Sequence, residues 1–483
     1  MKTHPDTPIG RLAMAARPSR PWLSIEASNW WTRVLLAGGA RHRPQPGTDL
    51  TGTYLYGADL TNANLTGADL SGAYLYGADL TNADLTNADL TNANLTNARL
   101  GGTNLSSANL TGADLSGAYL YGADLTNANL TNANLTGARL GGTNLSSANL
   151  TGADLSGAYL YGADLTNADL TNANLTGANL TNARLGGTRL SGVDLTNANL
   201  TGARLGGTRL SGVDLTGADL SGAHLYGADL TNANLTGADL SGAYLHGADL
   251  RSANLYGVNL RGVNLTNANL RGVNLRGKNL SDVNLTNVDL SGMNLSRMNL
   301  TGARLRGALL TDVDLRGVHL SRADLAGMDL TGVDLTGVDL HRADLAGVNL
   351  TGADLTNVNL TRANLTGADL TGVDLSGVDL SGANLSSANL TNANLRSARL
   401  LSSMGLISMK LTGADLTGAD LTGANLTADV DLVDVTWSEQ TRWPDGVAAE
   451  IRERSVPIGG GRYRVQGSGN TGADLSVPPV PVS

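Results

Sequence analysis

Leucine occupies every fifth position of the chain from Leu50 to Leu400 without exception. The position two before each leucine is almost always Ala or Val, and the position directly before it is usually Asp or Asn, as in Ala58-Asp59-Leu60. Thr or Ser follows the leucine, and Gly or Asn comes next. A short period that persists over hundreds of residues predicts a repeat architecture in place of an ordinary globular domain.

A five-residue period excludes the two simplest structures. Five residues advance an α-helix by about 500°, so the leucines would form no stripe along it. A continuous strand fails because its side chains alternate with a period of two. The pattern therefore predicts a three-residue extended bridge with Ala and Leu pointing inward, followed by a corner. Gly or Asn at the corner tolerates the positive φ that a type II turn requires.

Internal duplications indicate how many bridges close one turn of the solenoid. Residues 100–139 recur almost unchanged at 140–179, and residues 185–203 recur at 205–223, which are shifts of 40 and 20. Both shifts preserve every face if one coil contains four pentads, whereas the recurrence of 71–82 at 116–127 does not fit this rule. A four-sided coil places Leu60, Leu80 and Leu100 in one internal column, and Leu235 is expected in the same kind of core.

The repeated A(D/N)LXX word resembles the pentapeptide-repeat family. The resemblance covers about four fifths of the chain. It implies an all-β fold, a right-handed, four-sided (quadrilateral) parallel β-helix solenoid of about 19 coils with terminal caps. It also implies a non-enzymatic protein that binds other proteins.

The segments outside the repeats have a different composition. We expect an N-terminal flank and cap at 1–48, the β-helix at 49–435, a C-terminal cap at 436–466 and a disordered tail at 467–483. Residues 30–36 leave open a membrane-surface helix, although a cap over the first coil is favoured. In the C-terminal segment, Asp445 is a candidate N-cap for a short helix that contains Val447 and Ile451. The segment 462–465 is a candidate strand.

The regular spacing breaks near 401–410, where the next leucine after Leu400 is Leu406. Four apolar residues lie in or beside this break: Leu401, Met404, Ile407 and Met409. We expect a loop on one edge that packs on the C-terminal segment or on a second copy of the chain, which would give a homodimer through the C-terminal region.

The sequence gives little indication of a catalytic, cofactor or metal site. No nucleophile motif is present, and the glycines belong to the corners. His224 with His246, and His319 with His341, lie about one coil apart, but no carboxylate completes a ligand set. We therefore expect no catalytic residue, no cofactor and no metal. The chain has no cysteine, which suits a reducing cytoplasm, and no stretch is long enough to span a membrane.

The sign of the net charge changes from one segment of the chain to the next. Residues 50–250 carry a net charge of −10, residues 251–306 one of +6, and residues 311–380 one of −7. Lys278 occupies an inward position, where a charge is not easily accommodated. Four carboxylates spaced by 20 residues are expected to form one outward column, and the candidate partner-binding residues are Asp314, Asp334, Asp354 and Asp374.

Stacked carboxylates repel, and we expect no local gain in stability from them. Arg322, Arg342 and Arg362 are expected to pair with the neighbouring column that contains Asp324 and Asp344. A solvated acidic face that keeps the protein soluble is the simpler interpretation. The sharper hypothesis is a docking surface for a basic protein partner, with no direct binding of nucleic acid.

Two functions remain open. One is a rigid scaffold for protein–protein interaction. The other comes from the resemblance, because some family members imitate duplex DNA, bind type II topoisomerases such as DNA gyrase and protect them from quinolone-type drugs. Over residues 311–380, which span about 17 Å, DNA would carry about 10 charges. The net charge of −7 is of the same order, but the basic segment at 251–306 would repel a DNA-binding groove.

Overall fold

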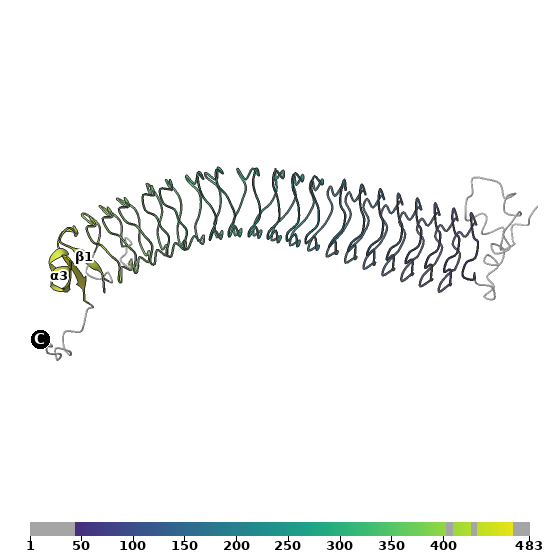
Figure 1. Cartoon of the computed structure of the whole chain (residues 1–483), viewed down its shortest axis with the longest axis horizontal. Coiled ribbons are helices and arrows are strands. Elements are labelled where there is room, and N and C mark those ends of the chain that lie inside the picture. The colour runs from purple at the N-terminus through teal and green to yellow at the C-terminus, as the bar shows by residue number, and fades with distance from the viewer. Residues whose placement is uncertain (1–43, 402–408, 427–431, 467–483) are drawn as a thin grey trace, which may run out of the picture. The chain divides into compact units, whose positions relative to one another are not determined.

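The structure, a computed structural model, describes residues 44–401, 409–426 and 432–466. Several expectations concern residues outside these ranges: most of the N-terminal flank, Met404, Ile407 and the tail at 467–483. Across the described repeats, nearly every pentad consists of one bridge and one two-residue turn, and successive coils stack along the solenoid (Figure 1).

The corner has the predicted chemistry. Between Leu60 and Ala63, the Ala63 amide donates to the Leu60 carbonyl at 3.0 Å, and Asn62 has a φ of 54°. Gly67 takes the same place in the next pentad with a φ of 62°. Asn and glycine adopt this left-handed conformation more readily than other residues, so the alternation of Gly and Asn after each leucine sets the position of the turn.

Successive coils pair at an interval of 20 residues. Asp59 bridges Asp79 in parallel, and Asp79 in turn bridges Arg99. The Leu60 amide donates to the Asp79 carbonyl at 2.7 Å, and the Asp79 amide donates to the Ala58 carbonyl at 2.9 Å. Four pentads therefore make one coil of a β-helix.

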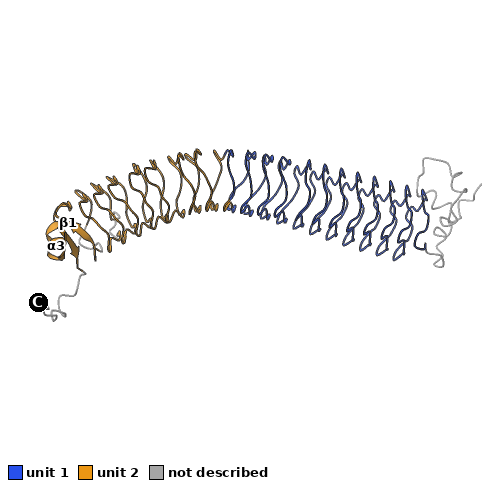
Figure 2. Cartoon of the chain, in the orientation of Figure 1, with its two compact units in different colours: residues 1–264, 268–274 blue, residues 265–267, 275–483 orange. Residues whose placement is uncertain are grey.

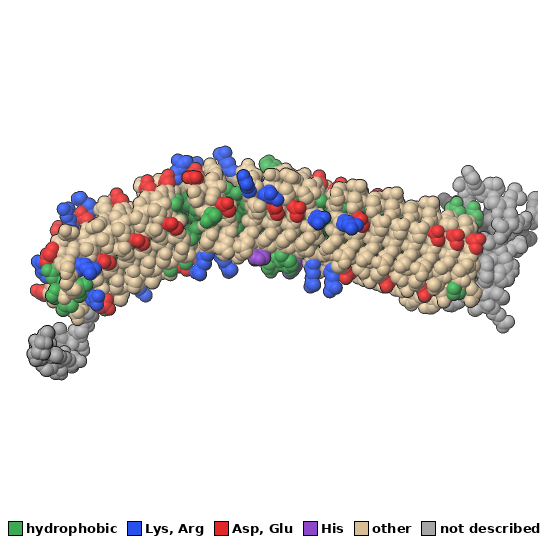
Figure 3. All heavy atoms as spheres, viewed as in Figure 1, with side chains coloured by type: hydrophobic (Ala, Val, Ile, Leu, Met, Phe, Trp, Pro, Cys, Tyr) green, Lys and Arg blue, Asp and Glu red, His purple; other side chains and the backbone are tan. Residues whose placement is uncertain are grey.

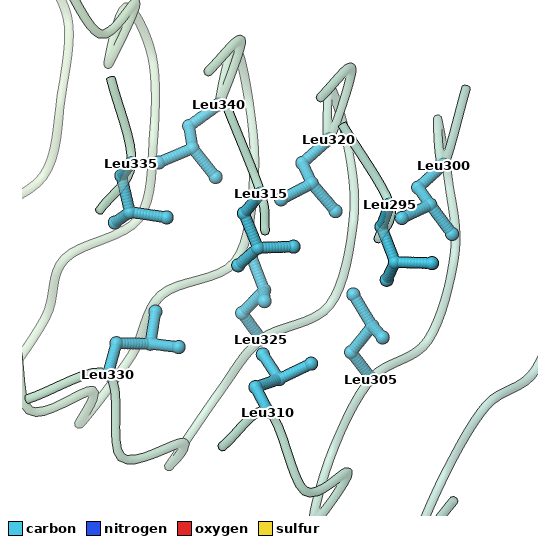
Figure 4. Close-up of a pocket in the computed structure, with 10 residues that line it drawn as sticks. All are labelled: Leu295, Leu300, Leu305, Leu310, Leu315, Leu320, Leu325, Leu330, Leu335 and Leu340. Atoms are coloured by element: carbon cyan, nitrogen blue, oxygen red, sulfur yellow. The ribbon is translucent and has the colours of Figure 1, made fainter. Parts of the chain in front are cut away.

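The core is built from the inward Leu and Ala side chains. Leu60 is 2% exposed, and Leu80, Leu100 and Leu235 are fully buried. Burying one leucine contributes about 1.5–3 kcal/mol, so the column is the main source of stability. Figure 4 shows ten leucines between Leu295 and Leu340 that point toward one another around a void of about 10 Å³. A void of this size is at the lower limit for one water molecule, so the interior is closely packed.

The chain divides into two compact units, residues 1–264 with 268–274 and residues 265–267 with 275–483 (Figure 2). In the first unit the small inward position is mostly Ala, whereas in the second it is often Val or Met. Lys278 takes this position in the second unit, where its side chain is half-buried and its amide donates to the Leu275 carbonyl at 3.0 Å.

The register changes near the end of the repeats. Asn384 bridges Lys410, an interval of 26 residues, because the segment that includes 402–408 is inserted between them. Asp415 and Asp420 in turn bridge Thr436 and Arg442, at intervals of 21 and 22 residues. Met409 is buried and Leu401 is half-buried.

A small sheet and a helix follow the last coil. The strands are β1 (Thr436–Ser438), β2 (Ser455–Gly459) and β3 (Arg462–Val465), and both pairings in the order β1-β3-β2 are antiparallel. Helix α3 (Ala448–Glu453) packs Ile451 inward. The prediction that Asp445 caps this helix is wrong, because Val447 holds the N-cap position and no side chain caps it.

Contacts between aromatic residues hold this segment together. Trp437 stacks on Tyr463 with ring centroids 4.7 Å apart, and its Nε1 donates to the Ser455 hydroxyl at 2.9 Å. The Leu416 amide of the last coil donates to the Thr436 carbonyl at 2.7 Å. In the part of the chain that the structure describes, no helix has the length and hydropathy needed to cross a bilayer.

Candidate interaction surface

The candidate surface begins with the outward residue of each pentad. Where this residue is Asp or Asn, its side chain folds back over its own corner, and its Oδ1 accepts the backbone N–H two residues later. Asp334 accepts from Thr336 at 2.9 Å and Asp354 accepts from Thr356 at 2.9 Å. Asp and Asn favour this local turn because their short side chains reach the amide without strain.

The four candidate carboxylates all make this bond. Asp314 accepts the amide of Arg316 at 3.2 Å, and Asp374 accepts that of Ser376 at 2.9 Å. The expectation that these carboxylates bring no local stability is therefore wrong. Each one satisfies a backbone donor at a corner, which offsets part of the repulsion between carboxylates in neighbouring coils.

The second carboxylate oxygen distinguishes the four residues. Arg316 donates through Nη2 to Oδ2 of Asp314 at 2.9 Å. For Asp334, Asp354 and Asp374, no hydrogen bond or ion pair to Oδ2 occurs within residues 44–401. These three carboxylates form no ion pair within the described repeats, although Arg316 acts electrostatically on Asp334 and the Thr336 hydroxyl also lowers the pKa of Asp354.

The column is not a continuous ladder. Asp334 bridges Asp354, whereas Asp314 bridges Asn294 and Asp374 bridges Asn394. Within the described repeats, no bridge joins Asp314 to Asp334 or Asp354 to Asp374. Among the four candidates, only Asp334 and Asp354 are therefore joined by a backbone bridge within the described repeats.

The titration of two of these groups follows from their contacts. The Arg316 side chain holds the pKa of Asp314 below its ordinary value. The Thr356 hydroxyl lowers the pKa of Asp354, and the Thr356 amide lowers it further. Both groups are therefore charged at neutral pH.

The neighbouring arginines do not pair as expected. Arg306 donates through Nε to Asp324, 2.7 Å from its Oδ2, and Arg306 Nη2 lies 3.6 Å from Oδ2 of Asp344. Arg322, Arg342 and Arg362 form no ion pair within the described residues. All three occupy left-handed corners, with φ of 59°, 58° and 59°. The prediction that they neutralise the adjacent column is wrong, because Arg306 from the preceding coil takes that role.

Amide ladders cover other parts of the surface. The Nδ2 of Asn129 donates to Oδ1 of Asn109 at 3.4 Å and to the Thr111 hydroxyl at 2.9 Å. The Nδ2 of Asn109 donates in turn to the Thr91 hydroxyl at 2.8 Å. Columns that contain Asn are thus joined from coil to coil by side-chain hydrogen bonds. The carboxylates of the candidate column form no such hydrogen bond with one another within the described repeats.

Aromatic and histidine side chains form separate stacks. Tyr54 stacks on Tyr74 with ring centroids 4.8 Å apart. His224 stacks on Tyr244 at 4.9 Å, and His224 Nδ1 lies 2.5 Å from the Tyr226 hydroxyl. No group of three or more His, Cys, Asp or Glu side chains that could hold a metal ion occurs among the described residues. Figure 3 shows acidic and basic side chains spread in rows over the visible face.

Solved structures of three repeat proteins resemble parts of the chain. HetL, involved in heterocyst differentiation regulation in the cyanobacterium Nostoc, is 33% identical; the match covers 59% of this chain and 93% of HetL, with a TM-score of 0.21. A protein of the Arabidopsis thaliana thylakoid lumen is 44% identical over 20% of this chain and 66% of its own, with a TM-score of 0.19. QnrB1, a plasmid-mediated fluoroquinolone resistance protein, is 17% identical over 50% of this chain and 92% of its own, with a TM-score of 0.19.

No curated protein sequence matches the chain. The family model for pentapeptide repeats, in contrast, matches residues 48–337, 339–402 and 406–428. These residues include nearly all of the five-residue pattern, its corners and its internal leucines. The protein therefore belongs to the pentapeptide-repeat family.

Proposed function

We propose that this protein is a non-enzymatic scaffold of the cytoplasm, a right-handed, four-sided β-helix of about 19 coils that binds a basic protein partner. The docking surface is the acidic stripe, defined as Asp314, Asp334, Asp354 and Asp374. The observation that carries the proposal is the pair Asp334 and Asp354, which form no ion pair within residues 44–401 and are held in register by a backbone bridge. A fixed, charged and incompletely paired surface favours association with a partner of opposite charge.

Affinity capture with three forms of the protein tests this proposal. The stripe variant changes Asp to Asn at the four stripe positions, which keeps the Oδ1 acceptor of each corner and removes the charge. The control variant makes the same change at four residues of the first unit that occupy the same position of the pentad: Asp89, Asp114, Asp124 and Asp154. A basic protein that binds the wild type and the control but not the stripe variant supports the proposal. Equal capture by all three forms contradicts it.

The DNA-mimic function is a second candidate, supported by the charge density of residues 311–380. Ion pairs reduce this density, because Arg316 compensates Asp314 and Arg306 compensates Asp324. We therefore favour the general scaffold. A gyrase supercoiling assay separates the two: inhibition or drug protection by the wild type, lost in the stripe variant, would establish the mimic, whereas an unchanged reaction would exclude it.

A further inference from the structure

Two successive coils of the second unit separate over the segments 307–313 and 327–334. A groove of about 630 Å³ lies between the segments 307–313 and 327–334, which belong to successive coils. Its volume is in the range of ligand-binding pockets. Figure 3 shows hydrophobic side chains at the surface of this unit.

The backbone on both sides of the groove lacks its usual partners. One coil earlier, the Leu290 amide donates to the Leu309 carbonyl at 3.0 Å, and the Gly292 amide donates to the Thr311 carbonyl at 2.8 Å. The equivalent donors in the next coil are the amides of Leu310 and Asp312. Within the described residues, no backbone hydrogen bond joins 307–313 to 327–334, so two strand edges face the groove.

Unpaired strand edges are the feature that an added β-strand recognises. An extended peptide pairs through its main chain, and its alternate side chains enter pockets on either side. Apolar side chains are available here, because Leu309 is 57% exposed and the inward residues Val313 and Val333 are half-buried instead of buried.

Charge indicates which peptide fits. The groove is lined by Asp312, Asp329 and Asp334, and its lining contains no Lys or Arg. The Thr331 hydroxyl lowers the pKa of Asp329, so this group is charged at neutral pH. The nearby Arg306 pairs with Asp324 and Asp344, and Arg316 pairs with Asp314 and also acts electrostatically on Asp334 at the edge of the groove. The groove therefore complements positive charge.

We propose that this groove binds an extended peptide segment of a partner protein that alternates basic and apolar residues, by adding it as a strand between two coils. The proposal deepens the scaffold function and rests on it, because it names a peptide recognition site that shares Asp334 with the acidic stripe. Lysines of the peptide meet the three aspartates, and its apolar side chains cover Leu309.

The test uses the full chain and a capped hexapeptide of alternating lysine and valine. Binding is measured by calorimetry, and backbone protection is measured by hydrogen exchange. We expect the peptide to slow exchange in 307–313 and 327–334. A peptide with methylated backbone nitrogens is expected not to bind, nor is one with glutamate in place of lysine.

A groove variant with Asp312→Asn and Asp329→Asn leaves all four stripe residues intact. Asn fits the left-handed φ of 57° at position 312 and retains the acceptor at 329. We expect about tenfold weaker peptide binding than for the wild type. A matched variant with Asp89→Asn and Asp114→Asn is expected to bind as the wild type does.

Any of three results would contradict the proposed peptide site. The backbone-methylated peptide could bind as tightly as the unmodified one, the peptide could slow hydrogen exchange only outside 307–313 and 327–334, or the groove variant could bind the peptide with the affinity of the wild type. If the peptide does not bind but the stripe variant still fails to capture the partner, the groove is not a peptide site and the scaffold function stands. If the peptide binds as expected but the stripe variant captures its partner normally, the groove stands and the acidic stripe is not the docking surface.

Discussion

At the scale of single residues, the outward aspartate has two functions that belong to its two oxygens. Oδ1 accepts the N–H of the corner, as in Asp334 and Asp354. Neither residue forms an ion pair within the described chain, so each keeps a charge that faces solvent. An aspartate can therefore stabilise its own turn and still attract a partner, and replacement by asparagine separates the two functions.

Asp89 offers a direct measure of the stabilising function. Its Oδ1 accepts the Thr91 amide at 2.9 Å, the Thr91 hydroxyl at 2.5 Å and Asn109 Nδ2 at 3.4 Å. We expect Asp89→Ala to lower the free energy of unfolding by about 1–2 kcal/mol, because donors lose their acceptor. Asp89→Asn should remain within about 0.5 kcal/mol of the wild type. Urea unfolding checks both, and equal loss in the two variants would contradict the assignment.

Internal leucines should be far more sensitive than exposed ones. Leu235 is fully buried, whereas Leu309 is 57% exposed. We expect Leu235→Ala to cost about 2–5 kcal/mol through lost burial and a residual cavity, and Leu309→Ala to cost less than about 0.5 kcal/mol. Hydrogen exchange near each site gives the local free energy of opening. Comparable losses at both positions would contradict the packing described.

At the scale of the structural element, the corner is the recurring unit. Gly137 has a φ of 64°, and a Cβ added to it would contact nothing within 4 Å. Gly137→Val should therefore destabilise the protein through its backbone conformation alone, by about 1–2 kcal/mol. Gly137→Asn should be tolerated because Asn62 holds an equivalent corner. Thermal unfolding distinguishes the two, and a neutral valine would contradict the left-handed assignment.

The same scale shows what the sequence could predict. The leucine period and the Gly or Asn at each corner predict the coil, because both follow from local backbone preferences. The hydrogen bond from the corner to Asp or Asn was missed, although the recurring (D/N)L(T/S) word contains it. The pairing of Arg306 with Asp324 depends on the reach of a long side chain between coils. The groove at 307–334 was also missed, because the leucine period continues through it, although Leu309 replaces the usual outward Asp or Asn and Asp312 replaces the usual Gly or Asn of the corner.

At the scale of the whole molecule, many small pKa shifts act in the same direction. Hydrogen bonds from Ser or Thr are the largest cause of a lowered pKa in Asp69, Asp84, Asp169 and Asp194, which lie in the first unit, and in Asp329 and Asp354, which lie in the second. A lowered pKa in the folded state means that the unfolded chain binds more protons in acid. The stabilisation is therefore complete above the ordinary Asp value of 3.8 and is lost as the pH falls through the lower folded values.

Acid should therefore destabilise the protein. We expect the midpoint of thermal unfolding to change little between neutral pH and about pH 5, and to fall steadily from about pH 4 to pH 2. Circular dichroism at each pH follows this change. A midpoint that is constant or rises on acidification would contradict the hydrogen bonds assigned to the outward aspartates.

The scaffold account depends on the acidic stripe as a place of docking, and one measurement tests this most directly. It is the affinity of the stripe variant for the basic partner captured by the wild type, measured at low and high salt beside the matched control variant. We predict that the stripe variant binds more weakly at low salt and loses most of its salt dependence, while the control variant behaves as the wild type does. Equal affinities and equal salt dependence in all three forms would contradict the account.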